Sequence, residues 1–140
     1  MDISPITKHL YIASRVKDED IEAIRQLGPD LIISMIVQRR PPKTLTAEGL
    51  EVLWLRTFDF PLIPIPLRTL KRGVEAALPV MQNGGRVLVF CEGGRHRSVA
   101  MAAAILIGTG FTAAEAMALI RARRPAADPY VFYIRRRIRI

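Results

Sequence analysis

The only cysteine of this 140-residue chain, Cys91, opens the stretch CEGGRHRS, in which an arginine follows six positions later. A thiolate is a strong nucleophile, and an arginine guanidinium has a planar pair of donors that fits two oxygens of a phosphate. Gly93 and Gly94 allow backbone conformations that turn successive amide groups toward one centre. These residue types and spacings predict a phosphate-binding loop with Cys91 at its base and Arg97 as an oxygen ligand.

The segments on either side of this loop favour the same chemistry. The apolar run Arg86–Phe90 predicts a strand before it, and a helix is predicted from about Ser98 to Gly108 after it. Ligands bind at the carboxyl ends of strands in α/β sheets, and a helix N-terminus presents N–H donors to an anion. Because helix N-termini and nearby cations favour the thiolate, we expect Cys91 to be ionised at neutral pH.

The stretch Cys91–Ser98 resembles the signature of the protein tyrosine phosphatase superfamily, which is cysteine, five residues, arginine and serine or threonine. Small size and the order of elements look like the dual-specificity branch, and the resemblance runs from Ile6–Ser14 through Gly110–Pro125 to the last helix. It implies a phosphocysteine on Cys91 that water then hydrolyses, with Ser98 assisting the second step. The residues that would bind the substrate phosphate are Glu92, Gly93, Gly94, Arg95, His96 and Arg97.

The family supplies its general acid from an aspartate about thirty residues before the cysteine. Asp59 lies 32 positions before Cys91, directly after a predicted strand and between Phe58 and Phe60. The resemblance therefore implies that Asp59 protonates the leaving group, and apolar neighbours would favour its protonated form. The alternative is a loop carboxylate that binds local backbone amides.

The chain departs from the family pattern at Phe90, where a histidine usually precedes the cysteine. One interpretation is an enzyme with weaker activation of its thiol. The other is a catalytically silent phosphate-binding module. Because Cys91, Arg97, Ser98 and Asp59 are all present, we favour the enzyme.

The expected substrates are phosphotyrosine, phosphoserine and phosphothreonine in proteins, because the loops look too short for a deep, tyrosine-selective pocket. The net charge of +8 keeps a phosphoinositide or an RNA 5′-triphosphate as alternative substrates for the same chemistry. Nucleic acid is not the favoured partner. A rhodanese-type sulfurtransferase is more distant, because its loop differs and lacks a counterpart of Asp59. Whether Arg95 and His96 face the pocket rim or solvent stays open.

The remaining arginines predict solvated surface. Arg39 and Arg40 follow a predicted buried strand, and a late cluster is expected to form a solvated basic face: Arg121, Arg123, Arg124, Arg135, Arg136, Arg137 and Arg139. No grouping of histidine, cysteine and carboxylate suits a metal, so neither metal nor cofactor is expected.

Cellular location is predicted from the N-terminus and the thiol. The segment MDISPITKHLYIAS does not look like a signal peptide, and one cysteine cannot form an internal disulfide. The apolar segment 99–120 is interrupted by Gly108–Gly110 and carries Glu115, which favours two packed helices over a membrane span. We therefore expect a cytoplasmic protein.

The order of patterns predicts an α/β fold with a mostly parallel central sheet and helices on both sides, in a single domain of residues 1–140. Pro79 is expected to end or kink its helix, and Trp54 to lie in the core. The expected strands are one or two within Ile6–Ser14, then Leu31–Val37, Leu50–Thr57 and Arg86–Phe90. The expected helices are one from Asp18 to Gly28, one turn within Gln38–Gly49, Leu67–Met81, Ser98–Gly108, one capped by Thr112 and Glu115, and one from Asp128 and Pro129.

Overall fold

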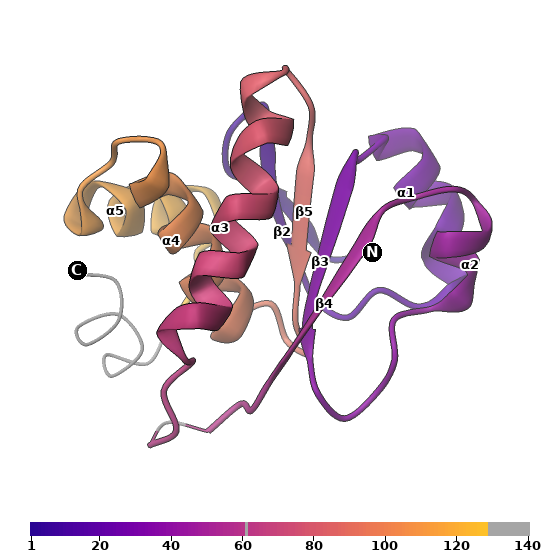
Figure 1. Cartoon of the computed structure of the whole chain (residues 1–140), viewed down its shortest axis with the longest axis horizontal. Helices are drawn as coiled ribbons and strands as arrows, with labels where there is room; N and C mark the ends of the chain where they lie inside the picture. The colour runs from indigo at the N-terminus through magenta and orange to yellow at the C-terminus, as the bar shows by residue number, and fades with distance from the viewer. Residues whose placement is uncertain (61, 129–140) are drawn as a thin grey trace.

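The computed structural model describes residues 1–60 and 62–128 (Figure 1). Five strands form one sheet in the order β1-β2-β5-β3-β4. Only β1 is antiparallel to its neighbour, so the prediction of a mostly parallel sheet is confirmed. The strands are β1 (Ile3–Pro5), β2 (Leu10–Ala13), β3 (Leu31–Ile36), β4 (Val52–Thr57) and β5 (Val87–Phe90).

Helices cover both faces of this sheet, as expected. Figure 1 shows α3, α4 and α5 on one side and the short α1 and α2 on the other. The capping box that Thr112 and Glu115 predict is present at the start of α5. The helical segments are the 3-10 turn η1 (Asp18–Asp20), α1 (Ile21–Leu27), α2 (Lys43–Ala47), α3 (Leu67–Gln82), α4 (Arg97–Gly108) and α5 (Ala113–Arg123).

The core lies between the central strands and α4. Every residue of β3 and of β5 is buried, as their continuous apolar sequences predict for parallel strands covered on both faces. Helix α4 is apolar nearly all round because it packs against the sheet, α3 and α5 together. Each buried isoleucine, leucine or valine contributes about 1.5–3 kcal/mol relative to an exposed one.

The parallel register places the loops that follow β2, β3, β4 and β5 at one edge of the sheet. Phe90, the last residue of β5, pairs with Ala13 at the end of β2 and with Ser34 near the end of β3. Thr57 at the end of β4 pairs with Ile36 of β3. Residues that follow these ends, among them Cys91 and Asp59, therefore emerge together.

The structure corrects the predictions made for Pro79 and Trp54, and a third prediction concerns residues that the structure does not describe. Helix α3 matches the predicted range Leu67–Met81 and continues to Gln82, so Pro79 does not end it; the amide of Asn83 donates to the Pro79 carbonyl. Trp54 is only half-buried, because β4 is an edge strand; its indole N–H donates to the Ile36 carbonyl and the Arg56 guanidinium stacks on its ring. The helix expected from Asp128 and Pro129 falls outside the described residues.

Arg124 is not part of a solvated basic face, in contrast to the exposed Arg121 and Arg123. It is 3% exposed, and its Nε donates to the carbonyl of Gly94 at 2.7 Å. The two terminal nitrogens donate to the Asp2 carboxylate at 3.0 and 2.7 Å, which lowers the pKa of Asp2. Arg124 thus ties the end of α5 and the N-terminus to the loop after β5.

Gly94 is required where Arg124 meets the loop. Its φ is +64°, a left-handed conformation that favours glycine. A Cβ at this position would also lie 2.8 Å from the backbone of Ala13 and would collide with the Arg124 guanidinium. The pair of glycines that suggested inward-facing amides therefore also has a packing role.

We expect Arg124→Met to destabilise the fold by about 2–3 kcal/mol, because it leaves the buried Gly94 carbonyl without its donor and removes the charge partner of Asp2. Arg123→Met is the matched control, since Arg123 is exposed, and should change the free energy of unfolding by less than about 0.5 kcal/mol. Urea denaturation with an unchanged m-value measures both. Equal effects of the two substitutions would contradict the bracing role of Arg124.

Candidate active site

Cys91 and Ser98 meet at the base of the loop between β5 and α4. Cys91 follows the last residue of β5 and is 2% exposed, and Ser98 lies fully buried in the first turn of α4. The Cys91 Sγ and the Ser98 Oγ are 3.1 Å apart. With sulfur as thiolate, the Ser98 hydroxyl is the donor of this bond, the arrangement that the resemblance implies.

Among residues 1–60 and 62–128, Arg97 is the largest fully buried side chain, although it carries a charge. Its Nη1 donates to the carbonyls of Met35 and Thr57 at 3.1 and 2.8 Å. Its Nε and Nη2 are buried and have no hydrogen-bond partner among the described residues. Buried polar groups are almost always paired, and a buried charge without compensation is costly. The two open donors therefore define a site for an anion.

An irregularity between β3 and β4 provides the carbonyls that hold Arg97. The register shifts between Ser34 and Ile36, so Met35 is not paired with a residue of β4. The Met35 carbonyl instead accepts from the Thr57 hydroxyl at 2.6 Å and from Arg97. Bulges of this kind re-aim backbone groups beside active sites. Here the bulge fixes the guanidinium in one orientation.

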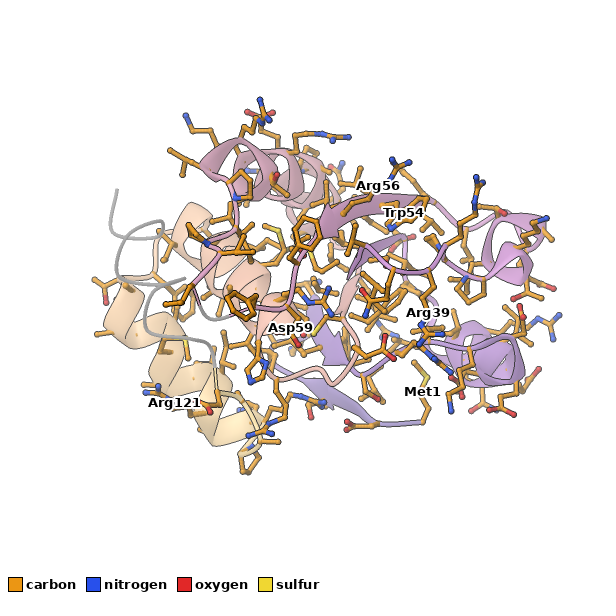
Figure 2. All side chains as sticks on the ribbon, turned by 90° about the horizontal axis from the view of Figure 1, so that it is seen from below. Met1, Arg39, Trp54, Arg56, Asp59 and Arg121 are labelled. Carbon is orange, nitrogen blue, oxygen red and sulfur yellow. The ribbon has the colours of Figure 1, made fainter. Side chains whose placement is uncertain are left out.

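Asp59 lies in the loop between β4 and α3, on the sheet edge where the Cys91 loop emerges (Figure 2). Its Oδ1 is 3.1 Å from the Nδ1 of His96, so it reaches across to the phosphate loop rather than bonding only to its own backbone. The flanking Phe58 and Phe60 are 59% and 50% exposed. The two rings therefore leave Asp59 exposed.

Arg95 and His96, for which the sequence left open a position at the pocket rim or in solvent, each form specific contacts. His96 contacts Asp59 as described. Arg95 turns toward the end of α5: its Nε donates to the Ala126 carbonyl at 3.2 Å, and its own carbonyl accepts from the amide of Asp128 at 2.9 Å. Arg95 thus connects the loop to the segment after α5.

Glu92 directs its carboxylate toward the rim of the site. Its oxygens lie 3.3 and 3.4 Å from Arg39 nitrogens and 3.5 Å from Arg15. The Glu92 carbonyl accepts from the Arg15 amide at 3.1 Å. The negative charge beside the thiol is therefore compensated by two guanidinium groups.

Phe90, in the place of the usual histidine, is 1% exposed and packs in the core. Its ring has no polar atom, so it cannot hydrogen-bond to the loop around Cys91. The Ser98 hydroxyl is the hydrogen-bonding group that the structure places at the Cys91 sulfur.

Residues 1–60 and 62–128 contain no group of three histidine, cysteine or carboxylate side chains that could hold a metal ion. Within the same ranges, no helix is both long enough and apolar enough to cross a membrane. The apolar segment from Val99 onward is divided into α4 and α5, as the glycines at its centre predict.

Sequence reasoning missed four groups that build this site: the carbonyls of Met35 and Thr57, and the pair of Arg124 and Asp2. The residue types in a sequence do not reveal where individual backbone carbonyls point. Arg124 stands just before Pro125 in the segment that resembles the family, which is the one signal that set it apart from its arginine neighbours.

None of the protein-family models matches the chain. Human dual specificity phosphatase 28 is 30% identical over 125 residues, which cover 89% of this chain and 69% of that protein. Human phosphatidylglycerophosphatase and protein-tyrosine phosphatase 1 is 46% identical over 59 residues, 42% of this chain and 29% of that protein.

Solved structures have the same fold. The crystal structure of human DUSP28 has a TM-score of 0.82 at 26% identity and covers 94% of this chain and 86% of that chain. PTPMT1 in complex with PI(5)P has a TM-score of 0.81 at 25% identity and covers 91% and 86%. With the fold, the Cys91 loop and the relative of 30% identity in agreement, the chain belongs to the dual-specificity phosphatase branch of the protein tyrosine phosphatase superfamily.

Proposed function

We propose that residues 1–140 form one catalytic domain that hydrolyses phosphotyrosine, phosphoserine and phosphothreonine monoesters through a phosphocysteine. The observation that carries the proposal is the fully buried Arg97, whose Nε and Nη2 lack partners among the described residues. Two parallel N–H donors fit two oxygens of a phosphate. Family membership supports phosphatase chemistry at this loop.

In the first step the Cys91 sulfur attacks phosphorus, and the bond between phosphorus and the ester oxygen breaks. Arg97 and the amides of the loop from Glu92 to Arg97 stabilise the charge that spreads over the three equatorial oxygens. Asp59, protonated, donates its proton to the leaving oxygen, so a neutral alcohol or phenol departs. His96 holds the Asp59 carboxyl above the loop through their 3.1 Å contact.

In the second step a water molecule attacks the phosphocysteine. The Asp59 carboxylate accepts the proton of this water, a new phosphorus–oxygen bond forms, and the phosphorus–sulfur bond breaks. Ser98 donates a hydrogen bond to the departing sulfur from 3.1 Å and so stabilises the thiolate. Inorganic phosphate leaves, and Asp59 is again protonated for the next cycle.

A second candidate keeps this chemistry and moves it to a phosphate on a lipid headgroup, such as a phosphoinositide. It is favoured by the similarity to phosphatidylglycerophosphatase and protein-tyrosine phosphatase 1, by the neighbour solved with PI(5)P, and by the net charge of +8. RNA 5′-triphosphate and a silent binding module have no comparable support. A cytoplasmic location is part of the proposal, because a reducing compartment keeps Cys91 from oxidation.

Hydrolysis of para-nitrophenyl phosphate is expected for the wild-type chain and should fall to background in Cys91→Ser, because an alcohol at this position is not ionised at neutral pH. Cys91→Ser should still bind inorganic phosphate, since Arg97 and the loop amides remain. Steady-state kinetics and calorimetry measure the two properties. A wild-type protein that binds phosphate and releases none from the ester between about pH 5 and pH 8 would favour the silent module.

We expect Asp59→Asn to slow turnover by about a hundredfold to ten thousandfold for phenyl phosphate, whose leaving group needs a proton. The loss should be much smaller for para-nitrophenyl phosphate, because nitrophenolate leaves without one. Comparison of kcat across esters of graded leaving-group acidity gives the answer. Glu75→Gln, which removes a carboxylate from an exposed position on α3, is the control. An equal loss with every ester would remove Asp59 from the acid role.

Phe90→His should shift the alkylation of Cys91 by iodoacetamide to lower pH, because an imidazolium near the loop favours the thiolate. Phe90→Leu is the control for lost packing at this buried position. Alkylation rates measured across pH follow the thiolate fraction directly. Identical profiles for the wild type and Phe90→His would show that the residue before Cys91 does not tune its ionisation in this chain.

A further inference from the structure

A basic cavity lies next to the end of β5, the strand that leads into the phosphate loop. Its volume is about 220 Å³, and its walls come from the segment after β2 and the segment after β3. Four cations line it: Arg15, Lys17, Arg39 and Arg40. Figure 2 shows Arg39 beside the loops at the edge of the sheet where Asp59 lies. The sequence had suggested only solvation for Arg39 and Arg40.

The positive charge of this cavity is only partly balanced. Arg15 and Arg39 share the single carboxylate of Glu92 at distances of 3.3–3.5 Å, long for charge-assisted hydrogen bonds. Arg40 forms no ion pair with any residue in the described ranges. Asp18 also lines the cavity and accepts a hydrogen bond from the Thr44 hydroxyl at 2.9 Å, and the Lys17 ammonium lies 3.8 Å from the Glu19 carboxylate. An additional anion would therefore find an excess of donors.

The Glu92 carboxylate links the cavity to the phosphate loop. Phe90, which precedes Cys91, lines the cavity, and Glu92, which follows Cys91, contacts Arg15 and Arg39 of the cavity wall. An anionic group of a substrate bound at Arg97 that displaces the Glu92 carboxylate would therefore meet Arg15 and Arg39.

We propose that Arg15, Arg39 and Arg40 bind a second phosphate of the substrate, so that the preferred substrates are bisphosphates on one small scaffold. This inference rests on the proposed function of the Cys91 loop. Guanidinium groups match phosphate geometry and bind it in pairs of hydrogen bonds. The cavity is smaller than the roughly 300–1,000 Å³ typical of sites for drug-sized ligands, which fits a single anionic group.

Glu92 acts in this scheme as the resident anion of the cavity. A monophosphate leaves the Glu92 contacts to Arg15 and Arg39 in place, whereas the second phosphate of a bisphosphate replaces them. The competing explanation is that Glu92 only braces the loop against its rim. The two differ in what Glu92→Gln does: removal of a competing anion strengthens bisphosphate binding, while removal of a brace weakens every ligand.

The test measures binding to Cys91→Ser, so it does not depend on turnover. Calorimetry compares a vicinal inositol bisphosphate with the matching inositol monophosphate. We expect the bisphosphate to bind about tenfold or more tightly, and Arg39→Ala with Arg40→Ala to abolish that preference, so that this variant loses much more affinity for the bisphosphate than for the monophosphate. The matched control is Arg68→Ala with Arg72→Ala, which removes the same charge from exposed positions on α3. Glu92→Gln should increase the preference severalfold.

The outcomes separate the subsite from the proposed function. Equal affinity for the two ligands, or an equal loss from both arginine pairs, would overturn the subsite and leave the Cys91 loop intact. Failure of both ligands to bind would overturn the two proposals together. A preference that appears with soluble bisphosphate supports a free substrate. A preference that appears only when the headgroup is carried in phosphatidylcholine vesicles supports a lipid source. Tighter binding of a doubly phosphorylated peptide than of the inositol bisphosphate would overturn the small scaffold.

Discussion

The burial of one charged guanidinium is the constraint on which the rest of the site depends. Arg97 uses one nitrogen to bind the carbonyls of Met35 and Thr57, and this fixes the direction of its two other donors. The isolated protein carries the cost of these unpaired buried donors. Because folding has already fixed the orientation of these donors, a phosphate can bind to them without a further cost of ordering the side chain. This is the general advantage of a preorganised site.

Each neighbouring element holds this arrangement from a different side. The bulge between β3 and β4 frees the Met35 carbonyl for Arg97, Arg124 holds Gly94 from the end of α5, and the Arg15 amide after β2 donates to the Glu92 carbonyl. The loop is thus connected to strand β3, to the end of α5 and to the segment after β2. Such connections explain how a loop with two glycines keeps a single shape without a disulfide or a metal among its described contacts.

The sequence predicted much of the fold because β3, β5 and α4 are buried on all sides and are therefore continuously apolar. It predicted that Cys91, Ser98 and Asp59 would gather because each stands next to the end of a strand or the start of a helix. It did not predict the burial of Arg124, because its partner Asp2 is distant in the sequence. By residue type alone, Arg124 resembles the exposed arginines beside it. Trp54 was misplaced for a similar reason: strand pattern does not reveal that β4 lies at an edge.

A crystal structure of the protein with orthovanadate, which mimics a phosphoryl group in transfer, tests the central claim most directly. We predict vanadium bonded to the Cys91 sulfur, with two of its oxygens accepting hydrogen bonds from the Nε and Nη2 of Arg97. Vanadate bound elsewhere, or an Arg97 side chain that turns away while Cys91 stays unmodified, would contradict the account.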